Sequence, residues 1–128
     1  MTAKKKLGMG LDLLLSAVET GSDRFGESMV PTEIKSLYEA AVDQDEKDNS
    51  LEAYHLYRRV TEIYETLTIE QTFGVHRVVS QAFNNLAIIL YENGQPDQAI
   101  KYLKRALEIW PENTTAQENF AAIKEGQW

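Results

Sequence analysis

The sequence predicts an all-α fold of about five helices, arranged as antiparallel helix pairs. Apolar residues recur at intervals of three and four along most of the chain, which is the spacing of one face of a helix. No segment shows the alternation of apolar and polar residues that a half-buried strand requires. Turn residues divide the helical pattern into five segments.

The first two helices are separated by an acidic run at residues 43–50. Proline suits the first turn of a helix, so the first helix is expected to begin at Pro31 or Thr32. The run DQDEKDNS ends that helix, and Ser50 is expected to cap the second one. The apolar stripe of the second helix consists of Leu51, Tyr54, Tyr57, Val60, Ile63 and Tyr64.

The third helix is expected to begin near Thr68. Thr68 and Gln71 have the spacing of a capping box, in which two side chains bond each other's backbone N–H groups. This helix should run to about Glu92, where Asn93-Gly94 stops it. Two more helices are expected, one that opens at Pro96 and one at 115–124.

The chain divides into a flexible tail at residues 1–30 and a helical domain at residues 31–128. Segment 16–30 mixes Gly, Ser and charged residues with little periodicity. Gly8 and Gly10, further upstream, each disfavour a helix by roughly 1 kcal/mol relative to alanine. We therefore expect the tail to become ordered only on a partner.

Composition and charge restrict the classes of partner. The net charge is −7, and it becomes −10 without the first six residues and their three lysines. Such a body repels nucleic acid and anionic lipid, so a charged partner should be basic. No run reaches the roughly 20 apolar residues of a membrane span. The expected location is the cytoplasm.

The sequence offers no candidate catalytic residue, metal ligand or cofactor motif. The chain has no cysteine, and neither of its two histidines, His55 and His76, has a carboxylate at the spacing of a ligand pair. The acidic run at 43–50 lacks the glycine that a calcium loop requires. No glycine-rich phosphate loop is present. We expect a protein that is not an enzyme.

Residues 83–111, FNNLAIILYENGQPDQAIKYLKRALEIWP, resemble the tetratricopeptide repeat. Small residues at Ala87, Ala99 and Ala106 let two helices approach closely, and Pro111 ends the second helix of the pair. A plain helical bundle would explain the apolar periodicity but not this Ala/Gly/Pro spacing. The resemblance implies an α-solenoid of stacked helix pairs.

A weaker copy of the repeat lies upstream, and the start of another lies downstream. Aligning Ala53 with Ala99 gives a separation of 46 residues, whereas the repeat period is about 34. The extra residues fall in Thr68–Val79, and we expect them to lengthen the second and third helices instead of forming a separate loop. The fifth helix resembles a polar capping helix.

The repeat resemblance implies an adaptor that binds a partner's segment in a groove lined by the first helix of each pair. The candidate groove contacts are Tyr38, Val42, Asn84, Asn85, Ile88, Tyr91 and Asn119. An asparagine such as Asn85 or Asn119 can pair with a bound peptide backbone through both its amide donor and its carbonyl acceptor. Some members of that family grip a partner's terminal carboxylate with lysine, asparagine and arginine side chains at five positions. In this chain those positions hold Tyr38, Val42, Asn85, Thr115 and Asn119, and only Asn85 agrees with the family, so we exclude this mode of binding.

The segment KKKLGMGLDLLL at residues 4–15 resembles the N-terminal peptide of ParB chromosome-partitioning proteins, which stimulates a ParA-type ATPase. The matching residues are Lys4, Lys5, Lys6, Leu7, Gly8, Gly10, Leu11, Leu14 and Leu15. Met9 stands where that family has a basic residue. The resemblance implies a bacterial regulator of a ParA/MinD-type ATPase. The alternatives are an idle tail, or a short amphipathic helix that docks on its own domain or on lipid.

Overall fold

The computed structural model describes residues 30–126, which form five α-helices and one short 3-10 helix. The helices are α2 (Val30–Glu46), α3 (Ser50–Glu65), η1 (Glu70–Thr72), α4 (His76–Glu92), α5 (Pro96–Ile109) and α6 (Thr114–Lys124). These residues contain no strand. The prediction of an all-α fold with about five helices is confirmed.

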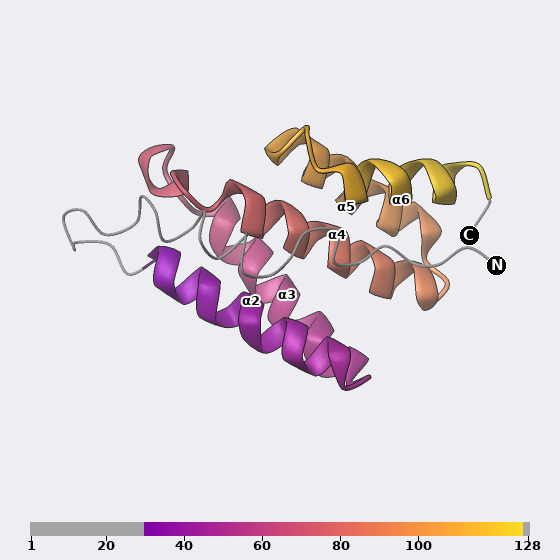
Figure 1. The fold of residues 1–128 in the computed structure, drawn as a ribbon, viewed down its shortest axis with the longest axis horizontal. Coiled ribbons are helices and arrows are strands. Elements are labelled where there is room, and N and C mark those ends of the chain that lie inside the picture. Colours follow the sequence, from indigo (N-terminus) through magenta and orange to yellow (C-terminus); the bar gives the residue numbers. More distant parts are fainter. Residues whose placement is uncertain (1–29, 127–128) are drawn as a thin grey trace.

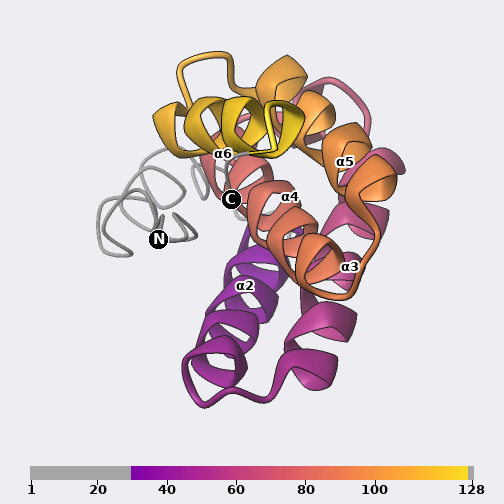
Figure 2. The same cartoon turned by 90° about the vertical axis from the view of Figure 1, so that its right-hand side faces the viewer.

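The helices form two antiparallel pairs followed by a single helix. α2 packs against α3, and α4 packs most closely against α5. Figure 1 shows α2, α4 and α6 running in the same direction, and Figure 2 shows α3 and α5 together on the other side of α4. This stacking of helix hairpins is the tetratricopeptide-like helical repeat fold.

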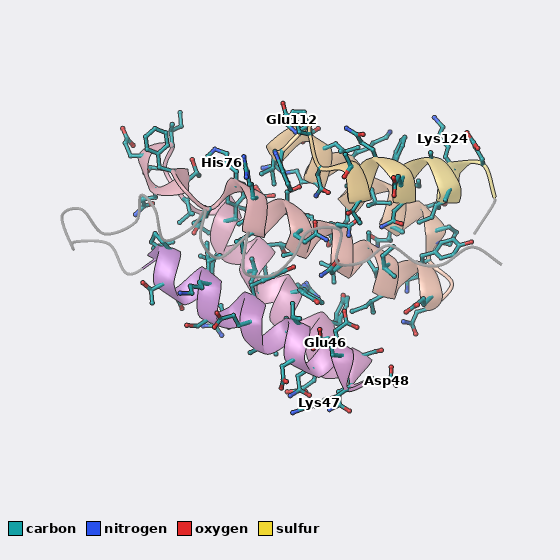
Figure 3. All side chains as sticks on the ribbon, viewed as in Figure 1. Glu46, Lys47, Asp48, His76, Glu112 and Lys124 are labelled. Carbon is teal, nitrogen blue, oxygen red and sulfur yellow. The ribbon has the colours of Figure 1, made fainter. Side chains whose placement is uncertain are left out.

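The turn between α2 and α3 differs by one residue from the prediction. Ser50 is the first residue of α3, and Asn49 occupies the position before it without a capping side-chain bond. Instead, the Asn49 amide donates to Gln44 Oε1 over 2.7 Å, which ties the turn to the end of α2. The charged residues Glu46, Lys47 and Asp48 gather at this tip (Figure 3).

The connection between α3 and α4 corrects the predicted extension of the helices. Residues 66–75 form a separate loop that contains η1, and α4 begins only at His76. The capping-box bonds do form: Thr68 N–H donates to Gln71 Oε1 over 2.9 Å, and Gln71 N–H donates to Thr68 Oγ1 over 3.3 Å. They close the turn of η1 and do not start α4. A reciprocal bond spanning three residues is satisfied by one short turn, so it does not require a long helix to follow.

The end of α4 and the starts of α5 and α6 lie at turn and capping residues. α4 ends at Glu92, Gly94 has φ +79°, and Pro96 is the first residue of α5. α6 starts after Asn113, whose side-chain oxygen accepts a hydrogen bond from the Ala116 N–H over 3.1 Å. That bond satisfies one of the backbone donors left without a partner at a helix start.

The core runs along α4, which is buried on every side. All thirteen residues from Val78 to Leu90 are buried. Ala99 and Ala106 are buried on the facing side of α5, where their small side chains allow the close approach of the two helices. Within residues 30–126, no helix is both long and apolar enough to span a bilayer.

Candidate protein-interaction face

The structure brings most of the predicted groove residues onto the helices α2, α4 and α6, but it buries them. Tyr38, Val42, Asn84, Asn85, Ile88 and Asn119 are buried, and Tyr91 is half-buried. We call the side on which α2, α4 and α6 lie next to one another the inner face (Figure 2). That these residues contact a partner remains a prediction.

Asn85 is the centre of a hydrogen-bond network that joins three helices. Its side-chain amide donates to the Tyr57 hydroxyl over 3.1 Å and to the Tyr38 hydroxyl over 3.5 Å. The Tyr57 hydroxyl in turn donates to Asp45 Oδ2 over 3.1 Å. The rings of Tyr38 and Tyr57 lie 5.9 Å apart at 53°, a tilted packing that fills the space between α2 and α3.

The network continues from Asn85 to α6 through asparagine side chains. The Asn84 amide donates to Asn85 Oδ1 over 3.0 Å, and the Asn119 amide donates to Asn84 Oδ1 over 2.9 Å. A row of buried amides therefore crosses the inner face from α2 to α6. Such a row fixes the register of the three helices, because an amide that slips out of place leaves a buried polar group without its partner.

A second branch ties α4 to α5 and to the start of α6. The Gln81 amide donates to Asn85 Oδ1 over 3.4 Å, and the Asn113 amide donates to Gln81 Oε1 over 3.3 Å and to Ser80 Oγ over 2.9 Å. The Ser80 hydroxyl donates to the Ala106 carbonyl over 2.7 Å. Every buried side-chain nitrogen and oxygen in residues 30–126 has a hydrogen-bond partner.

Burial perturbs the two tyrosines of this network. Removal from water raises the pKa of Tyr38 far above its ordinary value, since the charged phenolate is disfavoured there, and the hydrogen bond from Asn85 opposes the rise only partly. Burial raises the pKa of Tyr57 in the same way, and the negative charge of Asp45 adds to the effect. Both hydroxyls therefore stay protonated and neutral at physiological pH.

Sequence reasoning does not identify five members of the network. It predicts Tyr57 only as part of an apolar stripe and Asp45 only as part of the acidic run, and it does not single out Ser80, Gln81 or Asn113. A usable signal was present. Gln81, Asn84, Asn85 and Ile88 recur at intervals of three and four within an otherwise apolar helix, which places three amides on one stripe of α4. Polar residues in such a stripe must find partners when the helix is buried.

A separate hollow opens on the outer side of the molecule, between α3 and α5. It has a volume of about 600 Å³ and is lined by Ser50, Leu51, Tyr54, Arg58, Ile89, Leu90, Asn93, Gln95, Gln98 and Tyr102. Leu51 belongs to the predicted apolar stripe of α3, yet 70% of it is exposed. At the other end the two helices are joined, because Arg105 binds the carboxylate of Glu65 through two nitrogens.

A further hollow lies at the start of α4, near the turn between α5 and α6. It has a volume of about 510 Å³, and its lining includes His76, Arg77, Trp110 and Glu112. His76 is the first residue of α4, and Glu112 lies in the turn between α5 and α6; both are labelled in Figure 3. The guanidinium of Arg77 lies 5.2 Å from the centre of the Trp110 ring, a cation–π contact.

Among residues 30–126, no three His, Asp or Glu side chains are grouped closely enough to hold a metal ion. The N-terminal segment Lys4–Leu15, which resembles the ParB peptide, lies outside the described residues, as does the whole of the predicted tail up to residue 29.

Comparison with protein families supports the assignment of the central helix hairpin. Residues 80–113 match the family model of the tetratricopeptide repeat. The match covers α4 from Ser80, all of α5 and the turn up to Asn113, so it coincides with the resemblance found in residues 83–111. Comparison with curated proteins yields no match, and comparison with solved structures yields none either. A tetratricopeptide repeat points to interaction with another protein.

Proposed function

We propose that this protein is a non-enzymatic cytoplasmic adaptor whose inner face binds a segment of a partner protein. The observation that carries the proposal is the row Tyr38–Asn85–Asn84–Asn119, which crosses α2, α4 and α6 on one face. Amide side chains donate and accept at once, so they can exchange hydrogen bonds with the backbone of an extended or helical peptide. The match of residues 80–113 to the tetratricopeptide repeat also supports binding of a protein partner.

Apolar and aromatic groups beside this row would supply affinity. Ile88 lies one helical turn beyond Asn84, and Tyr91 lies one turn beyond Ile88. The half-buried ring of Tyr91 is the kind of rigid amphipathic contact that is enriched at interfaces. The described residues carry nine basic and sixteen acidic side chains, so a partner segment with basic residues is favoured over an acidic one.

Site-specific photocrosslinking tests this proposal. A benzophenone amino acid would replace Tyr91 on the inner face, Leu51 in the outer hollow, or Lys101 on the exposed side of α5. We expect one partner segment to crosslink through position 91 and to bind the purified protein with an affinity that Asn84→Ala lowers. Crosslinking through position 51 alone would move the site to the outer hollow. No crosslink at either position would remove the adaptor function.

The second candidate is a regulatory partner of a ParA/MinD-type ATPase, acting through Lys4–Leu15. It rests on the sequence of that segment, with a basic run followed by Leu7, two glycines and further leucines. The test is the hydrolysis rate of such an ATPase with the full-length protein and with a variant in which Lys4, Lys5 and Lys6 are alanine. An unchanged rate with both proteins, together with no binding, rules this candidate out.

A further inference from the structure

The inner face raises the question of what covers α4 between α2 and α6. α3 and α5 cover one side of α4 closely, whereas α2 and α6 contact it much less. Ile88 faces the less covered side, since it lies one turn from Asn84, which bonds to Asn119 of α6. Ile88 is nonetheless 0% exposed, and it is not part of the main hydrophobic cluster that residues 30–126 form among themselves.

We propose that the segment Lys4–Leu15 of the same chain docks on the inner face and occupies the site assigned above to a partner. A partner segment of similar chemistry, rich in leucine and basic at one end, displaces it. The inference rests on the proposed function, because it names the regulation and the ligand class of that same site.

The composition of the segment suits the face. The chain outside the described residues holds one dense apolar run, Leu11–Leu15, with four leucines in five positions. These side chains are the apolar partners that a buried Ile88 requires. Gly8 and Gly10 have no side chain beyond hydrogen, so the backbone there can approach the amides of Asn84 and Asn119 closely.

Charge favours the same pairing. Lys4, Lys5 and Lys6 form the densest basic run in the sequence, and residues 30–126 have a net charge of −7. Glu46 and Glu92 end α2 and α4, which run in the same direction, so these two exposed carboxylates lie at the same end of the inner face (Figure 1). A lysine run is attracted to that end.

The connection is long enough for the segment to reach any part of the face. Fourteen residues lie between Leu15 and Val30, and the extended chain between these two residues spans about 50 Å. α4 has 17 residues and is therefore about 25 Å long. A short flexible tether gives an effective concentration of the order of millimolar, so even a weakly binding segment competes with a free partner.

Cysteine protection in the full-length protein tests the proposal, because the natural chain has no cysteine that would react. Ile88→Cys serves as the reporter on the inner face, with the tail intact or carrying Leu11→Asp and Leu14→Asp. We expect the tail substitutions to speed thiol labelling at position 88 by at least about tenfold, the change that a docking free energy of about 1.4 kcal/mol would produce. Labelling of Lys101→Cys, on the exposed side of α5, should be fast with either tail.

Unfolding is separated from undocking by a core reporter. Leu103→Cys is fully buried in α5, so it should stay slow with either tail as long as the fold is intact. If labelling of Leu103→Cys also becomes faster with the substituted tail, the tail substitutions have unfolded the protein. The second measurement then uses a folded protein that keeps its natural leucines and carries a spin label at Ser16→Cys. Docking then broadens the side-chain amide signals of Asn84 and Asn119 but spares Gln98 on the outer side.

The outcomes distinguish this inference from the proposed function. Equal labelling of position 88 with both tails, or an absence of broadening at Asn84 and Asn119, overturns the docking of the segment. If a partner still crosslinks at position 91, the adaptor function stands without this regulation. If the tail slows labelling at position 88 but no partner binds, the docking of the segment is supported and the adaptor function is ruled out.

Discussion

The Asn85 side chain donates to the Tyr57 hydroxyl over 3.1 Å, and this bond connects the first helix hairpin to the second. The same amide reaches the Tyr38 hydroxyl, while its oxygen accepts from Asn84 and Gln81. One buried residue thus holds together side chains from α2, α3 and α4. Its loss should affect both the stability of the fold and the geometry of the inner face.

Asn85→Ala should lower the free energy of unfolding by about 2–4 kcal/mol. The substitution removes the bonds that Asn85 accepts from Asn84 and Gln81 and the bond that it donates to Tyr57, and breaking a buried hydrogen bond from one side costs about 1–3 kcal/mol. Urea denaturation monitored by circular dichroism measures the change. Gln98→Ala, on the exposed part of α5, is the control and should stay within about 0.5 kcal/mol of the natural protein. Equal stability of the two variants would contradict the network.

Stability should fall at high pH because of Tyr38 and Tyr57. Their pKa values are raised in the folded protein, mainly by burial, whereas an unfolded tyrosine titrates near about pH 10. Below that pH both states are protonated and the full stability is present. Above it, the unfolded chain loses protons that the folded chain retains, so the folded state is progressively disfavoured.

Urea denaturation at pH 9 and pH 11 would reveal this loss, and Tyr38→Phe with Tyr57→Phe should reduce it. Partial burial raises the pKa of Tyr64 as well, so the double variant should keep a smaller pH dependence. A loss of stability of the same size in the natural protein and in the double variant would mean that other groups are responsible.

The helix pairing of α4 and α5 could be predicted because its signals are local. Gly94 and Pro96 mark the turn, and alanines at fixed positions identify the close contact. The inner face could not be predicted to the same depth. The sequence predicts Asn85 as an exposed contact for a ligand. Only the packing of α2 and α3 shows that Tyr38 and Tyr57 enclose this side chain.

The loop at residues 66–75 shows a second limit of sequence reasoning. Val75 and Val79 continue the apolar spacing of α4, so the pattern favours one long helix. In the structure Ile69 and Phe73 are 83% and 73% exposed, and the chain turns at η1 before α4 begins. An apolar residue on a projecting turn and one on a buried helix face look alike in a periodicity pattern.

Ala99→Leu should destabilise the protein by about 1–3 kcal/mol. Ala99 is fully buried where α5 packs against α4, and three added carbon atoms have no space without a shift of the helices. Ala121→Leu is the matched control, since Ala121 is exposed on α6. Thermal unfolding of both variants measures the difference. An unchanged midpoint for Ala99→Leu would count against the close contact.

The ion pair between Arg105 and Glu65 should contribute only about 0.2–1 kcal/mol. Arg105 reaches both carboxylate oxygens, at 3.0 and 2.9 Å, but the two side chains are 36% and 48% exposed, so water screens the pair. A double-mutant cycle with Arg105→Gln and Glu65→Gln isolates this coupling. We expect it to vanish in about 1 M salt, where the screening length is near 3 Å. A coupling that persists there would show that geometry, and not charge, dominates.

Substitution of Gly94 should destabilise the protein through the backbone conformation alone. The φ of Gly94, +79°, lies in the left-handed region, and a Cβ placed there would meet nothing within 4 Å. Gly94→Ala should therefore cost about 1–2 kcal/mol through conformational strain. Gly94→Asn should cost less, since asparagine tolerates this conformation better than alanine does. Urea denaturation of the two variants gives the order, and a smaller loss with alanine than with asparagine would contradict the left-handed turn that separates α4 from α5.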